Sequence, residues 1–371
     1  MERDLTTGSI GRNILKFSLP YFLSYFLQTL YGMADLFIIG QFNGVASTTA
    51  VSIGSQVMHM ITVMIVGIAM GTTVMIGKSV GAKQKKETSK IIGNTVSLFV
   101  CLSIVLTVVL LFFVHPIVRI MSTPQQAVEG TTAYLTICFA GIPLITAYNI
   151  ISSIFRGLGD SKSPMYFIAV ACGVNIVLDY VFIGGLHFGA SGAALGTTLA
   201  QTVSVIVALI AIRKKDTGIS LKRSDLKPEG KTLKNILGIG IPISLQDGFI
   251  QISFIVITII VNQRGLNDAA AVGIVEKIIS FVFLVPSSML SAVSAIAAQN
   301  IGAGKDERAA KTLKYAVMIS VTFGLCIAVI MQFLSNAVVG IFTSDAVVIY
   351  MGSQYIRSYI WDCMIAGIHF S

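Results

Sequence analysis

Residues 90–114, KIIGNTVSLFVCLSIVLTVVLLFFV, begin with Lys90 and continue to Val114 without another charged side chain. A helix rises 1.5 Å per residue, so this stretch would cover about 37 Å as a helix, which exceeds the roughly 30 Å hydrocarbon core of a bilayer. The stretch therefore predicts a helix that crosses a membrane.

Comparable apolar stretches recur along the whole chain. Of its 371 residues, 54% are hydrophobic and only 12% are charged, against about 25% charged in soluble domains. No run alternates apolar and polar residues as the strands of a membrane barrel do. We therefore expect an all-α polytopic membrane protein, with kinks at Pro20 and Pro242. The ten predicted spans lie near residues 14–40, 47–77, 90–114, 130–155, 163–186, 190–212, 234–262, 270–300, 312–335 and 346–370.

The basic residues predict the orientation of these spans. All but four of the 26 Lys and Arg residues fall in the N-terminal segment and in every second loop, and the intervening loops hold only Arg119 and Arg264. Positive loops stay in the cytoplasm, so we expect a cytoplasmic N-terminus and residence in the cell membrane. The net charge of +9 is then a topology signal and indicates no nucleic-acid partner.

Signals for catalysis or for a bound cofactor are missing from the sequence. The five cysteines and four histidines are scattered, which predicts neither a disulfide framework nor a metal site. GAGK at 302–305 is followed by Asp306 where a phosphate-binding loop needs Ser or Thr. The N-terminus has no cleavable leader pattern, so the first span is expected to direct its own insertion. We expect a non-enzymatic protein without a cofactor.

The sequence repeats itself at an offset of 221 to 222 residues. This offset predicts a duplicated six-helix unit: an N-terminal lobe at 1–212, a basic cytoplasmic linker at 213–233 and a C-terminal lobe at 234–371. Because each unit has an even number of spans, both copies would insert the same way up, with a cavity between them near the midplane. The matching pairs are Pro20 with Pro242, Gly81-Ala82 with Gly302-Ala303, and Tyr134 with Tyr355.

At the same offset, residue 371 corresponds to residue 150, so the second copy stops within its fourth helix. The chain thus reads as a twelve-helix protein that lacks its last two helices. A natural truncation, an early stop and a fragmentary gene model all fit this pattern.

Several motifs together resemble the multidrug and toxic compound extrusion (MATE) family of transporters. The resemblance runs from the first span to the last residue and implies two helical bundles that form a V around a substrate cavity. It also implies cation-coupled export of hydrophobic, often cationic, compounds. The motifs are RGLGDSKSPM at 156–165, NIVLDYVFIGG at 175–185, GASGAALGTTLAQ at 189–201, SVGA at 79–82 and QNIGAG at 299–304.

Polar residues stranded in apolar spans form the candidate cation site. A carboxylate in mid-membrane costs about 2.5–3.5 kcal/mol, so Asp35 and Asp179 call for a functional explanation. Asn175 lies four residues before Asp179 on the same helix face, and Thr197 lies in a stretch of small residues that allows close helix approach. Their oxygens suit Na⁺, although two crowded carboxylates can instead share a proton.

The family resemblance implies that Asp35, Asn175, Asp179 and Thr197 are the cation-binding residues of the N-terminal lobe, with Thr198 as the alternative hydroxyl. The plainer alternative is that Asn175 and Asp179 only form hydrogen bonds between helices. Asp35 aligns with Ile257 in the second copy, so the site is expected to be asymmetric.

Further polar residues are candidates for the substrate cavity: Gln28, Tyr31, Asp247 and Glu276. Aromatic residues such as Tyr31 more often serve for packing. Glu276 and Lys277 fit a structural ion pair with Asp247 or with other partners better than they fit a contact with substrate. Arg357 and Asp362 are five residues apart, which is poor spacing for one helix face, so each is expected to have another partner.

The sequence thus favours a monomeric antiporter that exchanges Na⁺ or H⁺ for small hydrophobic or cationic drugs, with the coupling ion left open. One alternative is a flippase for lipid-linked envelope precursors, but its cavity would need several basic residues and only Lys277 and Arg357 are available. The other is an inactive truncated remnant.

Overall fold

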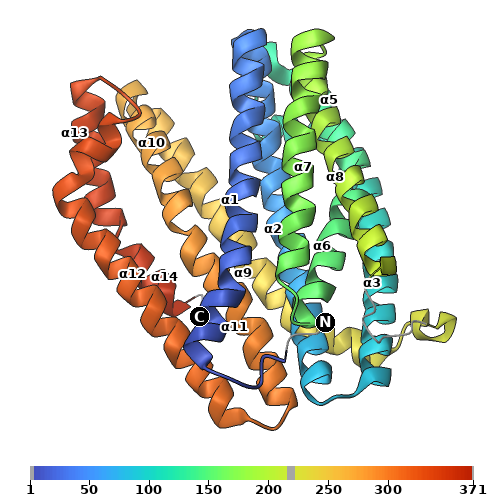
Figure 1. The fold of residues 1–371 in the computed structure, drawn as a ribbon. Coiled ribbons are helices and arrows are strands. Elements are labelled where there is room, and N and C mark those ends of the chain that lie inside the picture. Colours follow the sequence, from blue (N-terminus) through green and yellow to red (C-terminus); the bar gives the residue numbers. More distant parts are fainter. Residues whose placement is uncertain (1–3, 215–221, 370–371) are drawn as a thin grey trace. The chain divides into compact units, whose positions relative to one another are not determined.

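The computed structural model describes residues 4–214 and 222–369, and every regular element in them is helical (Figure 1). Eight of these helices are long and apolar enough to cross a membrane, and a bent pair makes a ninth candidate span. The prediction of an all-α polytopic membrane protein is confirmed. Arg3 and Lys215, which contributed to the orientation count, lie outside the described residues.

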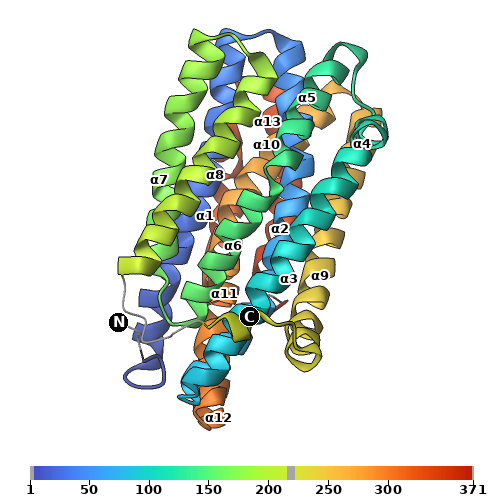
Figure 2. The same ribbon diagram turned by 90° about the vertical axis from the view of Figure 1, so that its right-hand side faces the viewer.

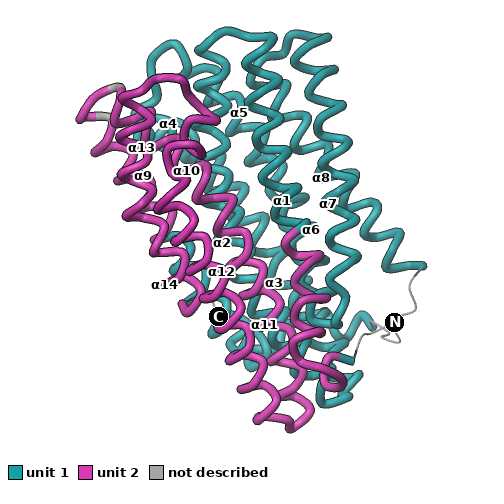
Figure 3. Tube along the Cα trace, turned by 60° about the vertical axis from the view of Figure 1, so that its left-hand side comes forward, with its two compact units in different colours: residues 1–4, 23–248 teal, residues 5–22, 249–371 magenta. Residues whose placement is uncertain are grey.

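The chain divides into two compact units, formed by residues 1–4 with 23–248 and by residues 5–22 with 249–371 (Figure 3). Two long helices, α1 (Ile10–Phe42) and α9 (Gly230–Arg264), are each shared between the units. Pro20 and Pro242 lie inside these helices, shortly before the residues at which the units divide.

The first unit contains most of the helices. Helix α7 packs along α8, and α2 packs along α5 and α6 (Figures 1 and 2). Besides its parts of α1 and α9, the unit comprises α2 (Val45–Gly81), α3 (Lys85–Phe112), α4 (Val114–Ile120), η1 (Gln125–Ala127), α5 (Val128–Ala140), α6 (Ile142–Gly157), α7 (Lys162–Asp179), η2 (Tyr180–Gly185), α8 (Gly189–Lys214) and η3 (Arg223–Leu226).

The second unit is smaller and is built around α12, which packs against three of its helices. Val275, Met331 and Ile356, from three different helices, meet in its apolar core. Besides its parts of α1 and α9, the unit comprises α10 (Leu266–Val282), α11 (Leu284–Gly302), α12 (Asp306–Gly340), α13 (Ala346–Tyr359) and α14 (Asp362–His369).

The helix bounds repeat at the offset found in the sequence. Helix α2 covers residues 45–81, and α10 and α11 together cover 266–302, which is 221 residues further along at both ends. Helices α3 and α12 begin at Lys85 and Asp306, again 221 residues apart. The duplication is therefore visible in the backbone as well as in the residues.

The tenth predicted span, at 346–370, differs from the expectation. It is divided between Tyr359 and Asp362 into α13 and α14, and neither piece qualifies as a span. The 14 residues of α13 would reach only about 21 Å. Its counterparts in the first copy, α5 and α6, are bent by 49° at Gly141, so a broken fourth span is common to both copies.

The two packing units have different bounds from the predicted lobes at 1–212 and 234–371, because the first half of α9 packs on α2. A Cβ on Gly71 would lie 2.1 Å from the Ile236 carbonyl oxygen, and one on Gly67 would lie 2.6 Å from the Cα of Ser244. These contacts place the start of α9 in the first unit. The lobe bounds describe the duplication and remain a prediction.

Candidate cation-binding site

Three helices of the first unit supply the predicted cation-binding residues. Helix α1 carries Asp35, α7 carries Asn175 and ends at Asp179, and α8 carries Thr197. Asp35, Asn175 and Asp179 are 4%, 1% and 0% exposed, so none of them faces lipid. Asn175 and Asp179 are one helical turn apart and both buried, as their spacing predicted.

The Asp35 carboxylate is the centre of this group. The Thr197 hydroxyl donates a hydrogen bond to Asp35 Oδ2 at 3.3 Å. The Asp35 side chain also lies within interaction range of Asp179 and Asn175. Thr198, the alternative hydroxyl, instead packs against Gly141. The structure therefore brings together the four predicted residues and selects Thr197 over Thr198 as the neighbour of Asp35.

Asp179 owes its position to a glycine on the neighbouring helix. A Cβ on Gly196 would lie 2.2 Å from Asp179 Oδ1, so only a bare backbone leaves room for this carboxylate. Gly192, one turn earlier on α8, packs on Phe182 in the same way. The small-residue stretch of α8 thus permits close helix approach, as predicted.

Directly after Asp179 the chain forms the wide π-helical turn η2, for which the sequence carries no clear signal. The Leu186 amide donates to the Val181 carbonyl, five residues back. Such turns insert one residue into a helix and occur frequently at functional sites. Here the wide turn begins one residue after the buried acid.

Several buried polar atoms of the candidate cation site have no hydrogen-bond partner within residues 4–214 and 222–369. In the described part of the chain, hydrogen-bond partners are lacking for Asp35 Oδ1, both Asp179 oxygens, and the oxygen and nitrogen of the Asn175 amide. Buried polar atoms are nearly always hydrogen-bonded or bound to an ion. Four of these five atoms are oxygens, the donor type that hard cations prefer, so the residues fit Na⁺ as well as a proton. No cluster of three or more His, Cys, Asp or Glu residues occurs within the described ranges.

A small hollow adjoins the acids. Tyr31, a predicted cavity residue, lines it, while Gln28 lies one turn earlier on α1 and is half-buried. Gln201 also lines the hollow, and its buried side-chain oxygen has no hydrogen-bond partner among the described residues. Gln201 was not among the residues predicted for the cavity, although its position four residues after Thr197 indicates the same helix face. The lining residues are Tyr31, Ala171, Asn175, Thr197, Ala200 and Gln201.

The remaining candidate residues lie elsewhere. Asp247 is half-buried on α9 in the first unit, and Glu276 lies on α10 in the second unit, where it interacts with Tyr355 and Tyr359. Glu276 Oε1 is buried and has no hydrogen-bond partner in the described residues. Within those residues neither acid forms an ion pair, so the structural pair considered from the sequence is not observed. As expected, Arg357 has another partner than Asp362, because its Nε donates to Ser335 Oγ at 2.8 Å.

Comparisons with known proteins agree with this architecture. "Probable multidrug resistance protein YoeA" of Bacillus subtilis is 27% identical over 97% of this chain and 79% of its own length. "Multidrug export protein MepA" of Staphylococcus haemolyticus is 24% identical over 98% of this chain and 80% of its own length.

Solved structures share the fold. A transporter of the MOP superfamily from Pyrococcus furiosus is 25% identical and has a TM-score of 0.89. The match covers 98% of this chain and 84% of that one. The MatE family profile matches residues 20–181 and 242–371, and the two matches begin at Pro20 and Pro242. The chain therefore belongs to the MATE family of membrane transporters.

Proposed function

We propose that this protein exports hydrophobic or cationic drugs from the cell and couples that export to the entry of Na⁺ or H⁺ at Asp35 and Asp179. The observation that carries the proposal is the group of buried oxygens around these two acids for which the described part of the chain offers no hydrogen-bond partner. The export direction and the class of substrate follow the multidrug proteins to which the chain is similar.

The position of Asp35 on α1 gives an entering ion a way to act on the whole transporter. Residues 5–22 of the chain pack with the second unit, whereas Leu23 onward packs with the first. A cation bound to Asp35 would hold α1 to α7 and α8, and so would favour one arrangement of this shared helix over another. An ion shifts a conformational equilibrium only by such differential binding.

Each residue of the site has a distinct role in this proposal. Asp179 and Asp35 supply the negative charge, Asn175 and Thr197 supply neutral oxygens, and Gly196 keeps Asp179 in place. Tyr31 and Gln201, which line the adjoining hollow, are the polar side chains that lie next to the site.

We also propose that the protein lies in the cell membrane as a monomer, with its N-terminus in the cytoplasm. The distribution of Lys and Arg supports the orientation. Lys83→Cys, in the turn between α2 and α3, tests the orientation. In intact cells, a membrane-permeant thiol reagent should label this cysteine and an impermeant reagent should not. Labelling by the impermeant reagent would reverse the assignment.

The coupling site is tested with the full chain in proteoliposomes. Ethidium transport is measured under an imposed Na⁺ gradient and, separately, under an imposed pH gradient. Asp35→Asn and Asp179→Asn should each abolish gradient-driven transport, and the gradient that drives the unaltered protein identifies the ion. Asp268→Asn, which changes a half-buried acid on α10 that pairs with Arg264, should leave transport unchanged. Unaltered transport by the double variant would refute the site.

A further inference from the structure

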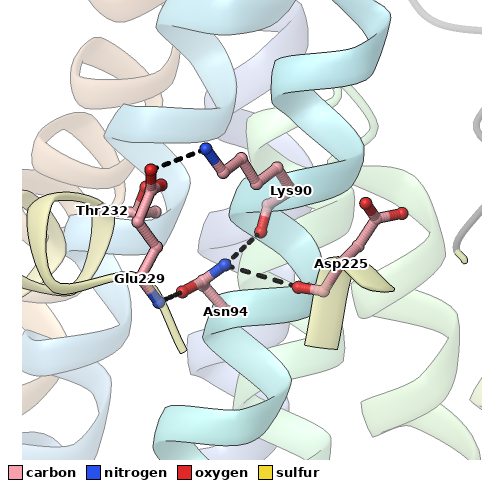
Figure 4. Close-up of polar contacts among 5 residues, drawn as sticks. All are labelled: Lys90, Asn94, Asp225, Glu229 and Thr232. Atoms are coloured by element: carbon pink, nitrogen blue, oxygen red, sulfur yellow. Dashed lines mark hydrogen bonds and ion pairs between the residues drawn. The ribbon is translucent and has the colours of Figure 1, made fainter. Parts of the chain in front are cut away.

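Residues 222–229, which include the turn η3, are fastened to one face of α3. The Asn94 side chain donates to the Asp225 carbonyl at 3.4 Å and accepts from the Glu229 amide at 2.6 Å (Figure 4). The Ser97 hydroxyl donates to the Leu226 carbonyl at 2.6 Å, and Lys90 forms an ion pair with Glu229 at 2.7 Å. The connection before α9 is therefore held in a fixed position beside α3.

A glycine makes this close approach possible. A Cβ on Gly93 would lie 2.2 Å from the Asp225 carbonyl oxygen, so the turn lies directly against the α3 backbone. Gly93, Asn94 and Ser97 thus form a docking surface for η3 on α3.

The depth of this docking surface is informative. Lys90 is the last charged residue before the apolar run of α3, and Asn94 and Ser97 follow it by four and seven residues. At 1.5 Å per residue, they lie about 6 and 10 Å further along the helix. The polar interface of a bilayer is about 5–7 Å thick on each side. With Lys90 at the outer edge of that interface, the η3 turn lies beside the first turns of a membrane span, from the lipid headgroups to the start of the acyl chains.

The hydrogen bonds of the segment are suited to this depth. A backbone group at the membrane surface must find a partner where water is scarce. The side chains of α3 provide partners for the carbonyls of Asp225 and Leu226 and for the amide of Glu229, while Pro228 has no amide hydrogen to satisfy. The backbone can thus lie at the interface without a large desolvation penalty.

The outward side of the turn is basic with one apolar residue. Lys222, Arg223 and Lys227 are exposed, and Leu226 between them is 41% exposed. The two nearby acids are engaged within the protein, because Asp225 accepts from the Lys222 amide at 2.8 Å and Glu229 pairs with Lys90.

We propose that η3 binds anionic phospholipid headgroups through Lys222, Arg223 and Lys227, with Leu226 inserted among the acyl chains. Basic residues next to a membrane span attract anionic lipids by about 1 kcal/mol each, which is about fivefold in affinity. The bound lipid would add to the attachment of the α9 start to α3. This inference needs only the docked turn and does not depend on the proposed export function.

A tryptophan reporter in the full chain tests the proposal. The single native tryptophan is removed by Trp361→Phe, and Leu226→Trp places the reporter in η3. The protein is reconstituted in phosphatidylcholine vesicles that contain brominated phosphatidylglycerol or, at equal mole fraction, brominated phosphatidylcholine. Bromine quenches tryptophan on contact, so we expect stronger quenching by the anionic lipid, and molar salt should weaken this preference.

Two triple variants that each remove three positive charges make the test specific. The η3 variant combines Lys222→Gln, Arg223→Gln and Lys227→Gln, and it should abolish the preference for quenching by the anionic lipid. Each substitution alone should lower this preference about fivefold or less. The matched control replaces three exposed basic residues elsewhere, Arg12, Lys162 and Lys314, by Gln and should keep the preference. Equal quenching by both lipids, no quenching by either, or a preference that survives the η3 variant would each overturn the proposal.

Discussion

Helix α2 runs without a break from Val45 to Gly81, whereas the corresponding stretch of the second copy is divided at Phe283 into α10 and α11. Pro286 explains the difference. It has no amide hydrogen to donate to the carbonyl of Val282, and its ring crowds that carbonyl. The residue 221 positions earlier is Ile65, which fits a continuous helix. One residue therefore changes the local path of a duplicated element without changing its ends.

The turns that follow are conserved in detail between the copies. The amides of Ala82, Lys83 and Gln84 bond to the carbonyls of Lys78, Val80 and Ser79. Ala303, Gly304 and Lys305 bond in the same way to Gln299, Ile301 and Asn300. Lys83 has φ +56° and Gly304 has φ +70°, so both turns end their helices with a left-handed residue. The two copies thus share the backbone hydrogen bonds of this turn. They differ in individual side chains, since Asp35 of the first copy corresponds to Ile257 in the second.

Exchanging these two residues gives the largest expected effect. In the variant with Asp35→Ile and Ile257→Asp, gradient-driven ethidium transport should be lost completely, because Asn175, Asp179 and Thr197 surround only position 35. Transport in proteoliposomes measures the effect, and circular dichroism checks that the helices remain. Recovery of transport would mean that the two copies are interchangeable and that α7 and α8 are not needed for coupling.

Gly196→Ala gives the next largest effect. Its methyl group would meet the carboxylate of Asp179, the mobile end of a side chain, so the helices can stay packed while the acid moves. We expect about tenfold weaker apparent affinity for the coupling ion, or about 1.4 kcal/mol, with normal expression. Gly173→Ala on α7 is the control, because a Cβ there meets no atom within 4 Å. Equal ion affinities in the two variants would contradict this role of Gly196.

The sequence predicts the spans well and names four polar residues that the fold brings together, but it misses features that depend on contacts between distant segments. Charge-free apolar runs such as 90–114 must be spans, because hydrocarbon tolerates little else. The same penalty identified Asp35 and Asp179. The docking of residues 222–229 on α3 and the wide turn after Asp179 have no comparable local signal. Gly93 and Asn94, for example, look like ordinary span residues until Asp225 is placed against them.

The two adjacent threonines of α8 offer a finer test of the site. Thr197→Val removes the hydrogen bond to Asp35. Because this bond is long and only half-buried, its loss should lower the apparent ion affinity by about fivefold. Thr198→Val alters a side chain that packs on Gly141, so it should leave ion affinity unchanged. Titration of transport against ion concentration distinguishes them. A larger effect from Thr198→Val would mean that the other hydroxyl serves the ion.

The smallest expected effect is a difference in acid sensitivity between two segments, one before α1 and one before α9, the first helices of the two copies. Residues 222–229 are held in part by a carboxylate, since Lys90 bonds to Glu229. Residues 5–7 are held by Asn300, Lys305 and Arg308, whose side chains donate to the carbonyls of Leu5, Thr6 and Thr7. None of these three hydrogen bonds has a carboxylate as a partner. Acid should therefore loosen the segment before α9 more than the segment before α1.

Glu229 determines whether acid stabilises or loosens the segment before α9. Its pKa lies below the usual range because Lys90 and then Thr232 donate hydrogen bonds to its carboxylate. A carboxyl group with a lowered pKa in the folded state stabilises that state above its unfolded pKa of about 4.3. This stabilisation is lost as the pH falls through the folded value.

Hydrogen exchange can follow this loss at two comparable amides, Glu229, which donates to Asn94, and Leu5, which donates to Gln299. Relative to intrinsic exchange rates, protection of Glu229 should fall on acidification and that of Leu5 should not. The change in protection should stay under about fivefold, because the side chains of Lys90 and Glu229 are 41% and 39% exposed and water screens the pair. Lys90→Gln should lower protection of Glu229 at neutral pH and remove most of its acid dependence. A parallel loss of protection at both amides would instead assign the acid effect to the whole fold.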